Sequence, residues 1–275
     1  MSLAYNPATK ALLSQLQANL PQGVLLEGLV GVGLFTAAQQ LASGDVAGII
    51  RPTDADGNED MTAKGIIRLP QIHELQQLAR GKSTRTQVFI IDNADQMNHQ
   101  AQNALLKLLE EPNESVRFIL TSHQPDALLD TILSRVQRVT VAPLSRDDSA
   151  HFIRTNGVKD ERKTTQLLFI ASGRPAELAR LIADDARFTK AAETAGDART
   201  LIGGTAADKM RVVMKYQSDK SAALQLLDAT RAMVLFSLQR SPSDELISFI
   251  DRLALAYDRI AANGNVRLQL VNVVI

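Results

Sequence analysis

The sequence of 275 residues contains neither cysteine nor tryptophan, and its 30 basic and 30 acidic residues cancel. Without cysteine, a disulfide framework and a thiolate metal site are both excluded, which suits a reducing compartment. A net charge of zero argues against a protein whose main task is to bind nucleic acid through a basic surface, although it is compatible with a local basic patch.

Long apolar runs are also missing. No stretch approaches the roughly 20 apolar residues of a membrane-spanning helix, and the first residues lack the basic and then apolar layout of a signal peptide. We therefore expect a soluble, cytoplasmic protein that does not associate with a membrane. Apolar residues nevertheless make up 45% of the chain, enough to form real cores, and the length suggests two or three domains.

Two short apolar runs lie in the middle of the sequence, at residues 88–91 and 116–120, and a further strand is expected at residues 136–141. Such continuous runs are typical of strands buried on both faces. The segments between them have the apolar spacing of helices. This alternation predicts a parallel sheet. We also expect strands at residues 47–50 and 66–69.

Polar residues follow two of these strands. Asp92 comes directly after the first apolar run, and Thr121 and Ser122 come after the second. Ligands of open parallel sheets bind outside the carboxyl ends of the strands. We therefore expect these three side chains to lie at the edge of the sheet where a ligand would bind.

A further strand at residues 24–26 runs into a glycine-rich loop with Gly28, Gly31 and Gly33, and a helix is expected at residues 34–41. Strand, glycine loop and helix form the context of a phosphate-binding loop. The glycines alone are a weak signal, because a tight turn that packs a helix closely against a strand needs them equally.

Two positions of the phosphate-binding motif are changed. The motif requires Lys and then Ser or Thr after its last glycine, whereas this chain has Leu34 and Phe35. Lys supplies charge to the β- and γ-phosphates and the hydroxyl holds Mg²⁺. Leucine and phenylalanine can do neither, so we favour a loop that does not bind nucleotide productively.

Only helical periodicity is found after residue 143. Ser145 begins a sequence that resembles a capping box, and Gly196 and the pair Gly203-Gly204 are the expected helix breaks. The four histidines, His73, His99, His123 and His151, lack the spacing of a zinc site. We expect them on the surface, and we expect neither a metal nor a cofactor.

Several segments together resemble a known family. These are QNALLKLLEEP at residues 102–112, FILTSHQPDALLDTILSRV at 118–136, NGNVRLQL at 263–270 and, more weakly, IIRLPQIHEL at 66–75. The chain resembles a clamp-loader subunit of the AAA+ superfamily, in particular the delta-prime subunits of bacterial DNA polymerase III. The similarity covers most of the chain and is strongest in its middle.

The resemblance implies an architecture and partners. The α/β parallel-sheet AAA+ domain, similar to a P-loop NTPase, would span residues 1–143, a small helical lid 144–196 and an all-α collar for oligomerisation 197–275. The implied partners are gamma- or tau-like ATPase subunits, a delta-like subunit and, through the complex, the sliding clamp and primed DNA. The implied role is an accessory subunit that helps to load the clamp during replication.

The resemblance also assigns roles to single residues. ATP-hydrolysing relatives carry a glutamate at the position of Asn93 and an arginine at the position of Ala176. Together with the changes in the glycine loop, these losses predict a chain without ATPase activity of its own, although Asp92 is retained. Ser134-Arg135 corresponds to the Ser-Arg-Cys motif, whose arginine reaches the ATP site of the neighbouring subunit. Ser134 would support that motif.

Three alternatives stay open. Arg135 could be an ordinary surface arginine, paired with a carboxylate such as Asp130. The chain could be an AAA+ ATPase with atypical motifs that still binds ATP. The glycine run could also belong to a dinucleotide-dependent α/β enzyme, but Asp54, the nominal acidic partner about 20 residues on, lies in a turn-rich segment.

Overall fold

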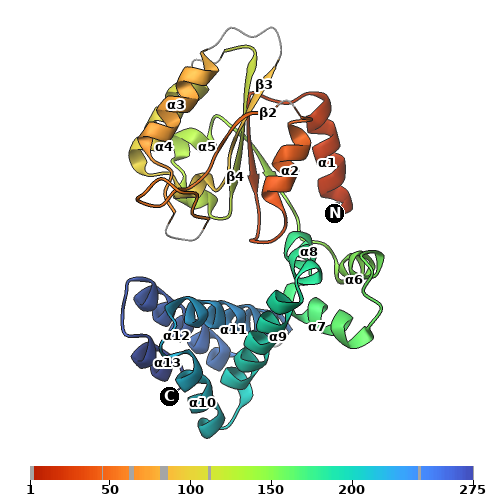
Figure 1. Ribbon diagram of the computed structural model, residues 1–275, viewed down its shortest axis with the longest axis vertical. Helices are drawn as coiled ribbons and strands as arrows, with labels where there is room; N and C mark the ends of the chain where they lie inside the picture. Colours follow the sequence, from red (N-terminus) through yellow and green to blue (C-terminus); the bar gives the residue numbers. More distant parts are fainter. Residues whose placement is uncertain are drawn as a thin grey trace. The chain divides into compact units, whose positions relative to one another are not determined.

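The structure is a computed structural model that describes residues 3–44, 46–61, 65–80, 86–110, 113–240 and 243–274. It divides into two compact units, Met1–Ala183 and Asp184–Ile275 (Figure 1). Residues 111 and 112, the end of the QNALLKLLEEP segment, lie outside the described residues. Within the described part of the chain, no helix is both long and apolar enough to span a membrane.

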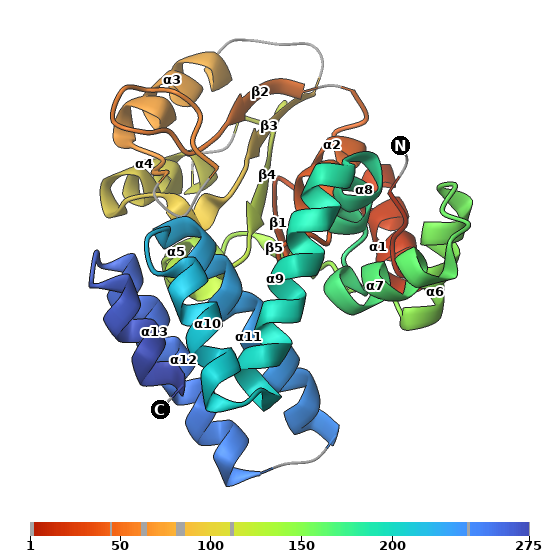
Figure 2. The same cartoon turned by 60° about the horizontal axis from the view of Figure 1, so that its bottom comes forward.

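The first unit is built on a five-stranded sheet in the order β2-β3-β4-β1-β5, and every neighbouring pair is parallel. Figure 2 shows β1 between β4 and β5. The strands are β1 (Gly23–Glu27), β2 (Val46–Ile50), β3 (Gln87–Ile91), β4 (Val116–Ser122) and β5 (Gln137–Thr140). The predicted parallel sheet is therefore confirmed.

Helices cover both faces of this sheet (Figure 1). On one side lie α1 (Pro7–Ala18) and α2 (Leu34–Leu41), and on the other α3 (Leu69–Ala79), α4 (His99–Glu110) and α5 (Asp130–Leu133). Side chains of β3 alternate between the faces: Val88 and Ile90 join the core under α1 and α2, whereas Phe89 and Ile91 join the core under α3 and α4. Burial on both faces explains the continuous apolar runs.

Two expectations about local structure are wrong in this unit. Residues 66–69 do not form a strand: Ile66 and Ile67 make only isolated bridges, and α3 begins at Leu69. The short helix expected after β4 is two pieces, the 3-10 turn η2 (Pro125–Ala127) and α5.

Three helices complete the first unit: α6 (Arg146–Thr155), α7 (Glu161–Ala171) and α8 (Pro175–Ala183). Ser145 caps α6 as predicted, because its hydroxyl accepts the N–H of Asp148 at 3.0 Å. Leu144 N–H donates to Gly173 O at 3.1 Å, and Gly173 N–H donates to the Ser149 hydroxyl at 2.9 Å. These contacts tie the loop before α8 to the start of α6.

The described part of the second unit is helical. It contains α9 (Asp185–Gly203), α10 (Ala206–Tyr216), α11 (Lys220–Arg240), α12 (Asp244–Ala261) and α13 (Val266–Val274), which enclose an apolar core. The break expected at Gly196 is wrong, because α9 continues through it, whereas the break at Gly203-Gly204 is confirmed. The expected lid–collar boundary at residues 196 and 197 falls inside α9, and the division into three domains stays a prediction.

Candidate functional site

The glycine run joins β1 to α2, as predicted, and its conformation explains its composition. Gly31 and Gly33 have φ angles of 91° and 96°, in the left-handed region that favours glycine. Gly28 is required for a different reason: a Cβ atom there would lie 2.8 Å from the carbonyl oxygen of Val141. Backbone geometry and close packing therefore account for all three glycines without a bound phosphate.

The N-terminal end of α8 contacts this loop directly. The N–H groups of Ala176 and Glu177 donate to the carbonyl oxygen of Gly31 at 2.9 and 3.2 Å. A Cβ atom on Gly31 would lie 3.0 Å from the Cβ of Glu177. N–H groups at the start of a helix have no partner within the helix and are well suited to bind anions. In α8, two of these groups are bound to the loop carbonyl.

The N-terminal segment of the chain covers the other end of the loop. The Tyr5 hydroxyl donates to the carbonyl oxygen of Gly33 at 3.3 Å, and a Cβ atom on Gly33 would lie 2.6 Å from a Leu3 methyl carbon. Burial raises the pKa of Tyr5 to about 12, so its hydroxyl keeps its proton at neutral pH. The loop is therefore contacted from both sides by residues of the same unit.

The two changed motif positions contribute apolar packing. Leu34 is 3% exposed and belongs to the core under α1 and α2, and Phe35 packs partly against the same core. The guanidinium carbon of Arg51 lies 4.5 Å from the centre of the Phe35 ring, a distance suited to a cation–π contact. Arg51 directly follows β2, so the end of this strand joins the site.

Asp92 is buried and bound by its neighbours, as expected for the end of β3. The Thr121 hydroxyl donates to Asp92 Oδ1 at 2.7 Å and accepts the backbone N–H of Asn93 at 2.9 Å. Arg51 Nε lies 3.7 Å from Asp92 Oδ2. Burial raises the pKa of Asp92, and the Thr121 hydrogen bond and Arg51 oppose this effect. The strand ends thus form the cluster that the sequence predicted.

His123 also belongs to this cluster, which corrects the expectation that it is a surface residue. Its Nδ1 lies 2.8 Å from the carbonyl oxygen of Gly28, and its backbone N–H donates to Asp95 Oδ1 at 3.2 Å. Because a carbonyl oxygen can only accept, Nδ1 carries the proton. The position of His123 just after β4 was the signal that could have placed it here. The other three histidines are exposed.

Arg135 lies elsewhere in the unit. It follows α5, and its exposed guanidinium is bound by three groups: Nη2 lies 2.8 Å from Glu110 Oε1, and Nη1 donates to the Thr131 carbonyl oxygen at 2.9 Å and to the Ser134 hydroxyl at 3.2 Å. Its carboxylate partner is Glu110, at the end of α4, and not Asp130. The Ser134 hydroxyl thus contacts the guanidinium, and its role in supporting the motif stays a prediction.

The position of Arg135 along the sheet is fixed by β1. A Cβ atom on Gly23, the first residue of β1, would lie 3.3 Å from the carbonyl oxygen of Arg135. Gly28 follows the last residue of the same strand. At about 3.3 Å per residue, the five steps between them separate the two ends by roughly 16 Å. Arg135 therefore lies at the amino end of β1, and the glycine loop lies at its carboxyl end.

A buried amide links α4 to the segment that carries Arg135. Gln102 donates to the carbonyl oxygens of Met97 and Ala127, both at 3.2 Å, and its Oε1 accepts the N–H of Leu129 at 2.8 Å. Sequence reasoning assigned this glutamine to a family segment but gave it no role. Its three hydrogen bonds hold α4 and η2 together.

The residues expected to replace the lid arginine also have defined places. Ala176 contacts the loop through its backbone N–H, which donates to the carbonyl oxygen of Gly31. Arg174 Nη2 donates to the carbonyl oxygen of Ile170, and burial lowers the pKa of Arg174. The guanidinium of Arg174 is thus engaged by α7.

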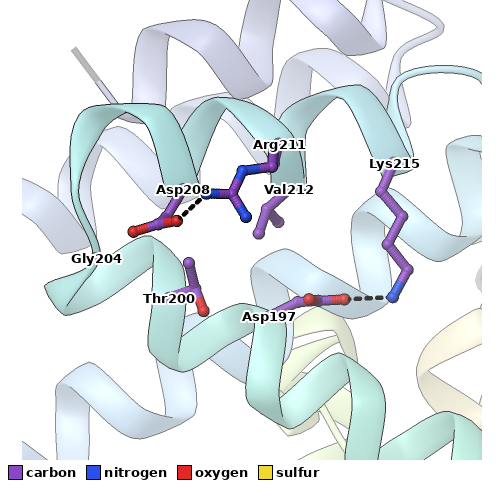
Figure 3. A pocket seen from close by; sticks show the side chains of 7 residues that line it. All are labelled: Asp197, Thr200, Gly204, Asp208, Arg211, Val212 and Lys215. Carbon is purple, nitrogen blue, oxygen red and sulfur yellow. Dashed lines mark hydrogen bonds and ion pairs between the residues drawn. The ribbon is translucent and has the colours of Figure 1, made fainter.

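The second unit contains a hollow of about 320 Å³ between α9 and α10 (Figure 3). Both cations at its rim are paired: Arg211 lies 2.5 Å from Asp208, and Lys215 lies 2.7 Å from Asp197. The hydrogen bond with Asp197 raises the pKa of Lys215. These pairs account for the charges around the hollow, and the candidate site remains the first unit.

The chain is similar to known proteins in sequence and in fold. Residues 39–145 match the family described as "DNA polymerase III, delta subunit". The subunit delta' of DNA polymerase III from Bacillus subtilis is 34% identical over 161 residues, which are 52% of this chain and 47% of that protein. The subunit tau from Escherichia coli is 28% identical over 196 residues, which are 68% of this chain and 29% of that protein. The chain spans about half or less of the length of these relatives.

A solved structure from Thermotoga maritima, a DNA polymerase III, gamma subunit-related protein, superposes with a TM-score of 0.58 over 97% of both chains, at 17% identity. At that identity the likeness shows the fold alone. The arrangement of strands and helices in this chain is therefore the one found in that structure. In sequence, the chain is similar to clamp-loader subunits, in particular to the delta-prime subunits of bacterial DNA polymerase III, as the sequence resemblance predicted.

Proposed function

We propose that this chain is a clamp-loader subunit that hydrolyses no ATP itself and supplies Arg135 to the ATP site of a neighbouring ATPase subunit. The neighbour would be gamma- or tau-like, and the assembly would include a delta-like subunit and load a sliding clamp onto primed DNA. The chain would thus be a non-catalytic accessory of a DNA polymerase complex.

The observation that carries this proposal is the position of Arg135. It lies at the amino end of β1, about 16 Å along the strand from the chain's own glycine loop. Arg135 follows the short helix α5, and its side chain is exposed. Its backbone carbonyl packs closely against Gly23. A permanently charged, planar guanidinium on a fixed backbone is suited to bind phosphate oxygens of another molecule.

The contacts of the glycine loop support the other part of the proposal, that this chain hydrolyses no ATP itself. The loop binds α8 and Tyr5 of its own chain, and the positions that would hold charge and metal are Leu34 and Phe35. Asn93 cannot accept a proton as a base. Phosphoryl transfer depends on charge compensation, metal and an oriented water, and each of the three contributions lacks its usual residue.

The substitution Arg135→Ala tests the function in the assembled complex. An arginine supplied in trans contributes about 10³–10⁵ in rate in GTPases. We expect the variant to assemble normally and to lower the ATPase rate of the complex by the share of the one site that Arg135 completes, because the other sites keep their own arginines. The measurement is phosphate release with primed DNA and clamp present, and Arg138→Ala is the control on the neighbouring strand. An unchanged rate for Arg135→Ala would contradict the trans role.

The chain alone provides the complementary measurement. We expect the purified protein to release no phosphate from ATP above background and to give no binding heat in a calorimetric titration with ATP and Mg²⁺. Binding heat without turnover would favour an AAA+ protein that keeps nucleotide passively.

A further inference from the structure

The ion pair between Arg135 and Glu110 has a consequence for the proposed function, on which the following inference rests. Both Nη atoms of Arg135, the atoms that a phosphate would bind, are already engaged: Nη2 by Glu110 and Nη1 by Thr131 and Ser134. In this arrangement the guanidinium cannot present both Nη groups to a phosphate, so the arginine must leave these partners to bind a neighbouring nucleotide through both groups. We call this bound arrangement the parked position.

Among the residues that the structure describes, Glu110 is the charged partner of Arg135 in the parked position. It is the last residue of α4, and its side chain is about half exposed. A carboxylate in the last turn of a helix is opposed by the helix dipole, so the stability of α4 does not explain a glutamate at this place. The pairing with Arg135 does explain it.

We infer that Glu110 is a positioning residue that keeps Arg135 parked until the phosphates of a neighbouring ATP compete for the guanidinium. Exposed ion pairs are weak, whereas a triphosphate presents several charged oxygens to a guanidinium, which binds them well. A docked neighbour without nucleotide therefore leaves the arginine on Glu110, and a neighbour with ATP draws it away. The parked position makes contact through Arg135 conditional on nucleotide.

The substitution Glu110→Gln keeps the side-chain volume and removes the charge that holds Arg135. When a competent state is only partly populated, apparent affinity falls by that fraction, so releasing the arginine restores affinity. We expect the concentration of this chain that half-activates the ATPase of the complex to fall by about two- to fivefold. The rate at saturation should stay unchanged, because Glu110 no longer holds the arginine once it is docked.

The experiment measures the ATPase rate while the chain is titrated into the ATPase subunits of the same organism. It compares four proteins: the unchanged chain, Glu110→Gln, Arg135→Ala and the double variant. Glu114→Gln, an exposed glutamate that does not pair with Arg135, is the matched control. The advantage of Glu110→Gln should shrink as salt rises from about 50 mM to about 500 mM, because the ion pair is then screened in every variant. A partial loss of folding would raise the half-activating concentration, which is the opposite of the expected fall.

The outcomes separate the two proposals. If Arg135→Ala has no effect, the trans role fails and the parked position has no functional meaning. If Arg135→Ala lowers the rate but Glu110→Gln leaves the half-activating concentration unchanged or raises it, the trans role stands and the inference about Glu110 is overturned. An equal effect of Glu110→Gln in the Arg135→Ala background would also overturn it, because that effect would not act through the arginine.

Discussion

The Arg51 guanidinium compensates the buried charge of Asp92 from within the chain. It lies 3.7 Å from Asp92, 2.9 Å from Glu59 and 4.5 Å from the centre of the Phe35 ring. The aromatic ring that replaced a hydroxyl thus faces a cation, a contact that stabilises by about 0.5–1 kcal/mol when exposed. Phe35, a departure from the motif, and Arg51 are therefore parts of one packed arrangement.

The titration of Asp92 gives a prediction at this scale. Burial raises its pKa above the ordinary value near 3.9, so the folded protein binds this proton more tightly than the unfolded chain. The contribution of Asp92 to stability is then fully present below the unfolded pKa and is lost as the pH rises through the folded pKa. Each unit of pKa difference corresponds to about 1.4 kcal/mol.

We expect Asp92→Asn to gain stability relative to the unchanged protein as the pH rises from about 4 towards neutrality. The free energy of urea unfolding of both proteins across this range is the measurement. The attraction between Arg51 and the ionised Asp92 is already part of the net pKa shift, so the slope of the difference decides. A flat or falling difference would contradict the raised pKa.

At the level of elements, the N-terminal end of α8 binds the glycine loop, which in a phosphate-binding motif would contact a phosphate. The helix start presents two N–H groups to Gly31 O, and close backbone approach is possible because Gly31 has no side chain. This approach makes the loop sensitive to a single methyl group.

We expect Gly31→Ala to lower the free energy of unfolding by about 2–5 kcal/mol. The left-handed φ of 91° costs an L-residue about 1–2 kcal/mol, and the new Cβ would lie 3.0 Å from Glu177 and 3.3 Å from Arg174, which adds about 1–3 kcal/mol of overpacking. Gly157→Ala is the control: its φ is 89° and nothing lies within 4 Å of the new atom. Equal losses in urea unfolding would show that α8 does not press on the loop.

Most elements could be predicted from the sequence because their apolar patterns are set by burial. The strands β1, β3 and β4 are buried on both faces, and α7 and α8 follow the helical periodicity expected after residue 143. Gly196 misled the prediction of α9, because glycine in a helix costs only about 1 kcal/mol relative to alanine. Buried Ala195, Ala198 and Leu201 hold the helix across it.

The contacts of the candidate site were harder to predict than its residues. Asp92 and Thr121 could be placed together, since the carboxyl ends of parallel strands share an edge. The closure by α8 and the pairing of Arg135 with Glu110 depend on how distant segments pack, which no local pattern encodes. Asp130 was the nearer carboxylate in sequence, but the end of α4 brings Glu110 to the guanidinium.

Across the first unit, the two edges of the sheet have taken different roles. At the carboxyl ends of the strands, the N-terminal segment and α8 contact the glycine loop, and Arg51 contacts Phe35. The exposed Arg135 lies at the amino end of β1. The proposed absence of nucleotide chemistry therefore does not depend on two residues of the loop alone. Restoring those residues should therefore not restore the site.

We expect the double variant Leu34→Lys, Phe35→Thr to bind no ATP, although it regains the residues of the phosphate-binding motif. The introduced amine would start from a position that is 3% exposed, the Gly31 carbonyl would still bind α8, and Arg51 would still face Asp92. Thermal unfolding with and without millimolar ATP and Mg²⁺ is the measurement. Ligand at about 100 times its Kd stabilises by about 2.7 kcal/mol, a shift of several degrees, and the unliganded transition shows that the variant is folded. An ATP-dependent rise in Tm would show that the two residues alone had closed the site.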